Sequence, residues 1–241
     1  NHAVDFEMRY LPAHAYAKEL IDEDYLGQLH RVDVTMTMER PWGEHGNWAA
    51  EQAQGGGVLT ELGSHFIDTL LWWLGDVSAV LSGTSTHFPT IRVPGKKESG
   101  NGSSIRKIVT GDDAFWCIMQ FKRGGEALVN FMTGARYDPG WTIGAYGQSG
   151  SLIVKSGQLL GMREGDREIS ILPIPKRLEI GTQPSDPLMW AMARLMERQL
   201  AKINQVPDAP PVPDFGDAIA VSRVIDAIRR SSNERRWVSV E

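Results

Sequence analysis

The stretch DDAFWCIMQFKRGGEALVNFMTG, residues 112–134, decides the fold class of this chain. Two apolar segments, 112–121 and 126–134, flank the polar turn KRGGE. Aromatic and β-branched residues suit strands, and a glycine pair supplies the positive φ angles that a tight hairpin turn requires. The stretch therefore predicts two antiparallel strands joined by a short turn.

Segments of the same kind surround this hairpin on both sides. Residues 28–39 alternate in polarity, with Val32, Val34, Met36 and Met38 on one face, which is typical of a half-buried strand. Downstream, short segments are separated by glycines or by charged turns such as REGDRE, the pattern of an antiparallel meander. The expected strands are 3–10, 28–39, 77–88, 112–121, 126–134, 140–147, 150–155, 158–163, 167–172 and 237–240.

Helical patterns lie mainly toward the two ends of the chain. The expected helices are 12–27, 59–74, 186–200 and about 217–232. The third of them carries an apolar stripe that we expect to pack in the core, formed by Leu188, Met192, Leu195, Met196 and Leu200. Helices on either side of a run of strands predict the α+β class, with a mostly antiparallel sheet and helices on one face.

Composition narrows the possible functions. The chain has 241 residues, enough for one large domain, and we expect residues 1–241 to form a single one, with 94–106 (PGKKESGNGSSIR) as a mobile loop. A net charge of −5 disfavours nucleic acid or an anionic membrane as the main partner. No apolar run reaches the roughly 20 residues of a membrane helix. The single cysteine, Cys117, lies in an apolar run, so we expect a buried thiol and a cytoplasmic protein without internal disulfides.

A second informative stretch is GGGVLTELGSHFIDTLLWWLGD, residues 55–76. Glycines before a helix often bind phosphate, but a dinucleotide fingerprint needs a strand, then G-x-G-x-x-G, then a helix. Here adjacent glycines follow a loop, and GAYGQSG (144–150) lies between two expected strands as a hairpin turn. Neither stretch predicts a pyrophosphate site.

The same stretch carries a polar stripe on an otherwise apolar helix. Glu61, His65 and Asp68 have the spacing that places side chains on one helical face. Histidine titrates near neutrality, and a carboxylate one turn away can fix its tautomer, so the stripe is compatible with general acid–base catalysis. The alternatives are a metal site, for which Glu-x-x-x-His supplies too few ligands, and a solvated stripe near a helix N-terminus.

The loop before the glycines contains PWGEHGNW, residues 41–48. Trp42, Asn47 and Trp48 suit a polyhydroxylated ligand, because indole rings stack on sugar rings and amides bind hydroxyl groups. His45 lies in the same loop and would border the same cleft. The alternative is that the tryptophans simply hold a long loop in place.

Four stretches together resemble one family. The segment GGGVLTELGSHFIDTLLWWLGDV is similar to the G-G-G-x-L-x-D-x-G-x-H-x-x-D segment of the Gfo/Idh/MocA oxidoreductases, the glucose–fructose oxidoreductase and inositol dehydrogenase group. The others, in the same order as in the family, are FEMRYLPAHAYAKELIDEDYLGQL (6–29), AYGQSGSLIV (145–154) and AIAVSRVIDAIRRSSNERRWVSV (218–240). The resemblance covers essentially the whole chain.

The resemblance implies a large open mixed sheet with helices on one face. It also implies an enzyme whose N-terminal Rossmann domain binds NAD or NADP and whose E-K-P motif supplies a catalytic lysine. This chain resembles only the second domain of that family, which binds substrate and pairs subunits through the outer face of the sheet. We therefore expect the dinucleotide to be bound mainly outside residues 1–241, with Gly56 and Gly57 passing close to the nicotinamide, and no metal.

The family motif also implies roles for single residues. Its histidine falls on His65, which would remove a hydroxyl proton, and its aspartate falls on Glu61, which would orient that histidine. Asp68 matches a later aspartate that orients the helix or packs against its neighbours. Glutamate at 61 reaches one methylene further than aspartate, which leaves the geometry at His65 open. The expected substrate contacts are Arg9, Trp42, Asn47 and Trp48.

The sequence thus supports two functions from different classes. The first is the substrate-binding and catalytic-base domain of an NAD(P)-dependent oxidoreductase for a sugar, polyol or related compound, inactive alone. The second is a non-catalytic, homodimerising assembly or ligand-binding module. A metal hydrolase is a weaker third, for want of ligands.

Overall fold

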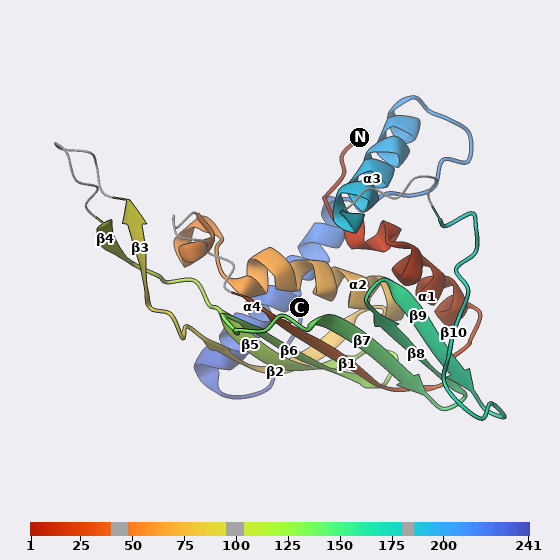
Figure 1. Cartoon of the computed structure of the whole chain (residues 1–241), viewed down its shortest axis with the longest axis horizontal. Coiled ribbons are helices and arrows are strands. Elements are labelled where there is room, and N and C mark those ends of the chain that lie inside the picture. Colours follow the sequence, from red (N-terminus) through yellow and green to blue (C-terminus); the bar gives the residue numbers. More distant parts are fainter. Residues whose placement is uncertain (40–47, 95–103, 180–185) are drawn as a thin grey trace.

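A large sheet forms the base of the molecule, and helices lie on one of its faces (Figure 1). This computed structural model describes residues 1–39, 48–94, 104–179 and 186–241. The nine strands lie in the order β10-β9-β8-β7-β1-β6-β5-β2-β11. The expected α+β class, with a large mixed sheet and helices on one face, is confirmed. No helix in the described part of the chain is both long and apolar enough to span a membrane.

The element boundaries follow the sequence pattern closely in most places. The helical elements are η1 (Glu7–Tyr10), α1 (Pro12–Asp22), η2 (Trp48–Ala50), η3 (Gln52–Gln54), η4 (Leu59–Gly63), α2 (Ser64–Leu74), α3 (Pro187–Ile203) and α4 (Phe215–Glu234). The strands are β1 (Leu29–Met38), β2 (Val77–Ser85), β3 (Thr90–Pro94), β4 (Ser104–Ile108), β5 (Ala114–Phe121), β6 (Glu126–Thr133), β7 (Gly140–Gly147), β8 (Gly150–Lys155), β9 (Gln158–Arg163), β10 (Ser170–Ile171) and β11 (Val238–Ser239).

The sheet is a meander into which a distant strand is inserted. The hairpin predicted from residues 112–134 is β5–β6, with Cys117 opposite Val129. Strands β7, β8 and β9 follow one another as antiparallel neighbours. Between β6 and β7, however, lies β1, which runs parallel to β6 and antiparallel to β7. This one parallel pair makes the sheet mixed.

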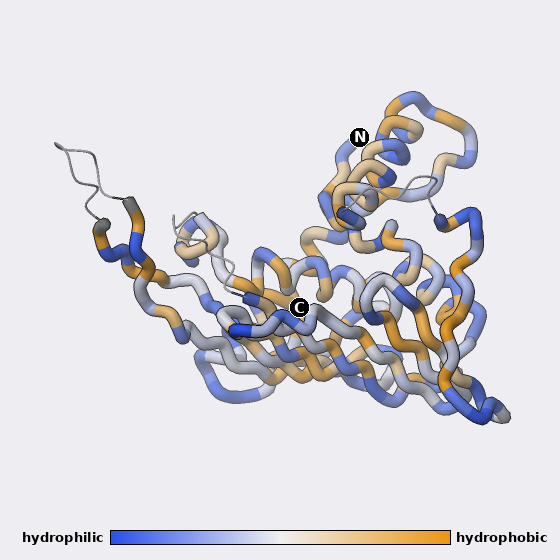
Figure 2. The backbone as a smooth tube through the Cα atoms, in the orientation of Figure 1, coloured by the Kyte–Doolittle hydropathy of each residue, from blue (hydrophilic) through white to orange (hydrophobic). Residues whose placement is uncertain are grey.

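The hydrophobic core lies between one face of the sheet and the helices. In β1, Val32 and Val34 are fully buried, and Cys117 is buried in β5. In β6, exposed and buried residues alternate along the whole strand, so the other face of the sheet is open. Figure 2 shows the apolar segments gathered along the strands and the helices above them.

The N-terminal segment corrects one prediction. Residues 3–10 were expected as a strand, but Glu7–Tyr10 form a 3-10 turn, and Val4 donates a single backbone hydrogen bond to the Pro213 carbonyl. In the turn, the neighbours Glu7 and Met8 are both buried. A strand cannot bury two adjacent side chains on one face, because consecutive residues point in opposite directions.

Helix α3 corrects a second prediction. Its expected core stripe is buried only at Leu195, while Leu188, Met192, Met196 and Leu200 are exposed. The helix projects from the body beside the N-terminal end (Figure 1) and packs against η1 through one narrow side. Helical periodicity gives the direction of a stripe but not whether another element covers it.

The loop expected at 94–106 is partly a hairpin. β3 ends at Pro94 and β4 begins at Ser104, and the two strands pair as a separate small sheet, with Val93 opposite Ile105. The remaining residues of that prediction, 95–103, lie outside the described residues.

A partly buried ion-pair network joins the N-terminal turn to two helices. Arg9 in η1 donates from Nε and Nη2 to the two carboxylate oxygens of Asp68 in α2, at 2.8 and 2.6 Å. Its Nη2 also donates to Asp217 at the start of α4, at 2.8 Å. The Asp68 side chain is 1% exposed. Burial raises the pKa of Asp68 to about 6, against the opposing effect of Arg9.

We predict that Arg9→Ala lowers the free energy of unfolding by about 3–5 kcal/mol at pH 7.5, because it leaves Asp68 buried without its cation. Urea unfolding followed by tryptophan fluorescence measures this. Below the Asp68 pKa of about 6 the protonated carboxyl needs no cation, so the loss should shrink at pH 5. The control is Arg31→Ala, which removes an exposed pair with Asp33 and should cost about 0–1 kcal/mol. Equal losses for the two variants would contradict the role of Arg9.

Candidate active site

The polar stripe predicted from residues 55–76 begins at a break in helix geometry. Leu59–Gly63 form a π-helical turn that continues into α2, with His65 as the second α2 residue. A Cβ on Gly63 would meet the Phe115 ring at 2.9 Å, so glycine lets this turn lie directly on β5. π-Helical turns inside helices are frequent at functional sites.

The imidazole of His65 contacts a carboxylate that the sequence did not single out. Its Nδ1 lies 3.1 Å from Oε2 of Glu7, whose side chain is only 9% exposed, while the His65 side chain is 26% exposed. Phe6 packs edge-on against the imidazole. Burial lowers the pKa of His65, but the hydrogen-bonding and charge of Glu7, with the charges of Asp5 and Asp68, outweigh burial and raise it.

Glu61, the predicted partner, lies in electrostatic range of His65 but makes no ion pair or hydrogen bond with it. One Glu61 oxygen, Oε2, is buried and has no hydrogen-bond partner in the described part of the chain. Burial raises the pKa of this carboxyl, and the charge of His65 partly offsets the effect. The structure thus brings the two predicted catalytic residues near each other and places Glu7 in contact.

The glycines before the helix have a packing reason to be small. A Cβ on Gly56 would lie 2.4 Å from the Ala49 carbonyl oxygen, and one on Gly57, at φ +108°, would lie 2.2 Å from Oδ1 of Asp112. The Gly57 N–H donates to the Ala49 carbonyl. Asp112 in turn accepts from the Leu59 N–H at 2.8 Å and so caps the π-helical turn. The contact of these glycines with a nicotinamide stays a prediction.

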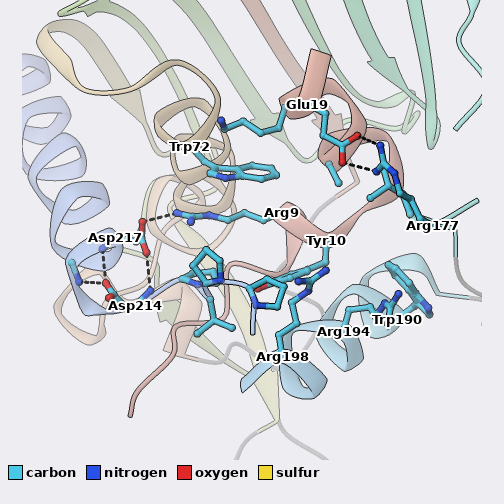
Figure 3. Close-up of a pocket in the computed structure, with 18 residues that line it drawn as sticks. Arg9, Tyr10, Glu19, Trp72, Arg177, Trp190, Arg194, Arg198, Asp214 and Asp217 are labelled. Carbon is cyan, nitrogen blue, oxygen red and sulfur yellow. Dashed lines mark hydrogen bonds and ion pairs between the residues drawn. The ribbon is translucent and has the colours of Figure 1, made fainter. Parts of the chain in front are cut away.

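Arg9 lies on the wall of a cavity of about 690 Å³ (Figure 3). This cavity lies between η1, α1, α2, α3 and the proline-rich segment 210–213, and Tyr10, Trp72 and Trp190 line it. The residues lining it do not include His65. Asp68 and Asp217 already hold the Arg9 guanidinium, so its first role here is structural. A contact with substrate stays a prediction.

Of the loop residues predicted to contact substrate, only Trp48 belongs to the described residues. Trp48 begins η2 and is 48% exposed. Trp42, Asn47 and His45 lie outside the described residues. Within the described residues, no group of three or more His, Cys, Asp or Glu side chains is placed to hold a metal ion.

The sequence pattern does not single out Glu7, because the alternation of residues 3–10 predicts a strand. The signal that could have found it is the order of charges in two segments, an acid then a base in one and a base then an acid in the other. Glu7 and Arg9 on η1 face His65 and Asp68 on α2, an acid against a base in each case. The resulting arrangement, a partly exposed imidazole backed by a buried carboxylate, is suited to accepting and returning a proton.

Known proteins are similar to this chain in sequence and in fold. The GFO/IDH/MocA C-terminal domain family matches residues 14–153, more than half of the chain. An uncharacterized oxidoreductase of Synechocystis sp. is 25% identical over 250 residues, covering 98% of this chain and 64% of that protein. The chain therefore spans less than two thirds of that relative's length.

Solved structures agree with the fold. The apo form of levoglucosan dehydrogenase superposes with a TM-score of 0.84 at 21% identity, covering 98% of this chain and 65% of the other. The super-repressor mutant of Gal80p from Saccharomyces cerevisiae superposes with a TM-score of 0.78 at 16% identity, covering 99% of this chain and 64% of the other.

We predict that Gly57→Ala destabilises the chain by about 2–5 kcal/mol, because it combines an unfavourable positive φ with overpacking against Asp112. The control is Gly55→Ala, where φ is +83° but nothing lies within 4 Å of the added methyl group. This control should cost only the conformational strain, about 1–2 kcal/mol. Thermal and urea unfolding of both variants measures the difference, and a loss at Gly57 no larger than at Gly55 would contradict the packing role.

Proposed function

This chain belongs to the GFO/IDH/MocA family, and we propose that it supplies the substrate-binding surface and the catalytic base of an NAD(P)-dependent oxidoreductase acting on a sugar, polyol or related hydroxy or keto compound. The observation that carries the proposal is the partly exposed His65 imidazole backed by the buried Glu7 carboxylate. Levoglucosan dehydrogenase, similar in fold, forms complexes with NADH and levoglucosan and with NADH and L-sorbose.

The residues present fit a hydroxylated substrate. Glu61 Oε2 is buried without a partner in the described part of the chain, beside an imidazole that can take a proton. Oε2 is closed to solvent, so a substrate would meet Glu61 at its other carboxylate oxygen. One hydroxyl would give its proton to the imidazole, and a neighbouring hydroxyl would donate to Glu61. The exposed indole of Trp48, with Trp42 and Asn47, would flank the sugar ring, as the sequence predicts.

The glycine turn fits a pyrophosphate poorly. The Gly57 N–H is already bonded to Ala49, and the next two N–H groups, of Val58 and Leu59, are bonded to Asp112. A phosphate cradle needs such groups free. We therefore assign the dinucleotide, NAD or NADP, mainly to residues outside 1–241, and expect this chain alone to lack redox activity.

His65 would act as the base in substrate oxidation. NAD(P), when bound, supplies the hydride acceptor. The imidazole accepts the hydroxyl proton of the substrate as the carbon of that hydroxyl is oxidised, and returns it in the reverse reaction. Only the neutral imidazole can accept a proton. Because Glu7 raises the His65 pKa, the rate of oxidation should increase with pH through a pKa above the ordinary value of 6.5.

We predict that the complete gene product containing these residues oxidises a member of a sugar and polyol panel with NAD⁺ or NADP⁺, followed as absorbance of the reduced nicotinamide. His65→Ala should lower kcat/KM by about 10²–10⁴-fold, because it removes the general base. His30→Ala, an exposed histidine on β1, is the control and should change little. Normal kcat/KM in His65→Ala across the pH range would exclude the role of His65.

A second function keeps some support. The solved structure of a super-repressor mutant of Gal80p has the same fold. The fold therefore also occurs in a protein that is named for repression and not for a redox reaction. A non-catalytic, homodimerising module would retain the sheet and need no base. The coding sequence before Asn1 discriminates between the two: a G-x-G-x-x-G and an E-K-P there favour the enzyme.

Both functions are compatible with pairing through the open face of the sheet. Trp116, Leu128 and Met132 project from neighbouring strands on that face and are 48%, 37% and 41% exposed. Exposed apolar groups clustered on one surface are typical of a contact site. We propose that a second copy of the chain covers them.

We predict that the chain sediments as a dimer and that Leu128→Glu shifts it to monomer, because the substitution places a charge in the centre of the apolar face. Leu188→Glu, at an exposed apolar position on α3, is the matched control and should leave the dimer intact. Circular dichroism checks that both variants fold. A monomeric wild type at micromolar concentrations, or an unaffected Leu128→Glu dimer, would contradict the assignment.

A further inference from the structure

We propose that Glu7, and not Glu61, is the carboxylate that holds the His65 imidazole and determines which of its ring nitrogens accepts the proton. Glu7 would then be a positioning residue, and Glu61 would be left to bind substrate. This inference rests on the proposed function for its consequence in catalysis. The coupling between Glu7 and His65 itself can be tested on residues 1–241 without any catalytic reaction.

The contact itself selects one ring nitrogen. His65 Nδ1 is shut off from solvent and lies 3.1 Å from Glu7 Oε2, an ion-pair contact in which neither atom has the geometry of a hydrogen bond. An ionised carboxylate can only accept a hydrogen bond, so it favours the tautomer with the proton on Nδ1. The exposed 26% of the His65 side chain excludes Nδ1, which leaves Nε2 and the carbon atoms as the parts that solvent can reach. Nε2 is therefore the nitrogen with a free lone pair.

Glu61 is placed for a different task. It lies on the π-helical turn before α2 and makes no hydrogen bond or ion pair with His65. Its Oε2 is buried and unpartnered in the described part of the chain, and its carboxyl has a raised pKa because of burial. Oε2 is closed to solvent, so a substrate would meet Glu61 at its other carboxylate oxygen. The hydroxyl that faces Nε2 of His65 has only one proton to donate, so a neighbouring hydroxyl of the substrate would bond to Glu61.

The position of Glu7 is fixed by a stronger pair. Arg9 follows Glu7 by two residues in η1, and Asp68 follows His65 by one turn of α2. The bidentate Arg9–Asp68 pair therefore sets the distance between η1 and α2 at the level of Glu7 and His65. The charged groups that act on the imidazole are thus Asp5 and Glu7 from the N-terminal segment, Asp68 from its own helix, and Glu61 from η4.

Nuclear magnetic resonance of the 241-residue chain tests the assignment without any turnover. Ring nitrogen and carbon shifts of His65, assigned with a His65→Gln sample, report its tautomer and pKa in the wild type and in Glu7→Gln, Glu7→Met and Glu61→Gln. We expect the Nδ1-H tautomer in the wild type. Both Glu7 variants should lower the His65 pKa by about one unit or more, and Glu7→Met, which has no acceptor, should also mix the tautomers.

Glu61→Gln is the matched control, with the same change of charge one turn from His65. It should leave the tautomer unchanged and shift the pKa less than Glu7→Gln does. The reverse order, with a larger effect from Glu61→Gln than from Glu7→Gln, would overturn the proposal. So would a wild-type His65 with its proton on Nε2. Far-ultraviolet circular dichroism confirms that each variant is folded.

Kinetics of the complete gene product separate this inference from the proposed function. Glu7→Gln should lower kcat more than it raises KM and move the pH profile of kcat/KM to lower pH, whereas Glu61→Gln should act mainly on KM. If the gene product oxidises no member of the panel but the resonance shifts follow Glu7, the proposed function fails and the Glu7–His65 coupling stands. If it is active and His65 does not respond to Glu7, only the present inference fails.

Discussion

The pairing of Arg9 with Asp68 and Asp217 is the interaction on which the site depends. A carboxylate as deeply buried as Asp68 is costly without a cation, and a guanidinium fork satisfies both of its oxygens at once. The third contact, to Asp217, extends the network to α4. One side chain therefore fixes an N-terminal turn against two helices that lie far from it in the sequence.

The arrangement of side chains around His65 follows from this network and from the glycine turn that precedes the same helix. Arg9 and Asp68 hold η1 against α2, which places Glu7 beside Nδ1 of His65. Asp112 caps the π-helical turn that carries Glu61. Glycine at 57 lets this cap approach, since a methyl group would collide with it. Both Glu7 and Glu61 thus act on His65, and in the described part of the chain Glu7 is the one that forms an ion pair with it.

Local sequence patterns predicted most of the helices and strands, but they did not predict which distant elements pack against one another. The alternation in 112–134 gave the β5–β6 hairpin, because neighbouring strands with a short turn have few other ways to pair. No such constraint places β1 between β6 and β7. The apolar stripe of α3 is periodic, yet Leu188 and Leu200 are exposed. Periodicity shows which residues share a helical face, but it does not show whether another element packs on that face.

By itself the sequence determined that Glu61, His65 and Asp68 lie on one continuous helical segment, although Glu61 falls on its π-helical first turn. It also determined that a mostly antiparallel sheet supports this segment, because spacing and alternation are properties of the local chain. Tertiary structure decided what these side chains do. Asp68 pairs with Arg9, and Glu7 contacts His65. The partners in each pair lie far apart in the sequence, so helical or strand periodicity cannot relate them. A residue acquires its pKa and its partner from groups packed around it, and packing is settled only when the whole chain has folded.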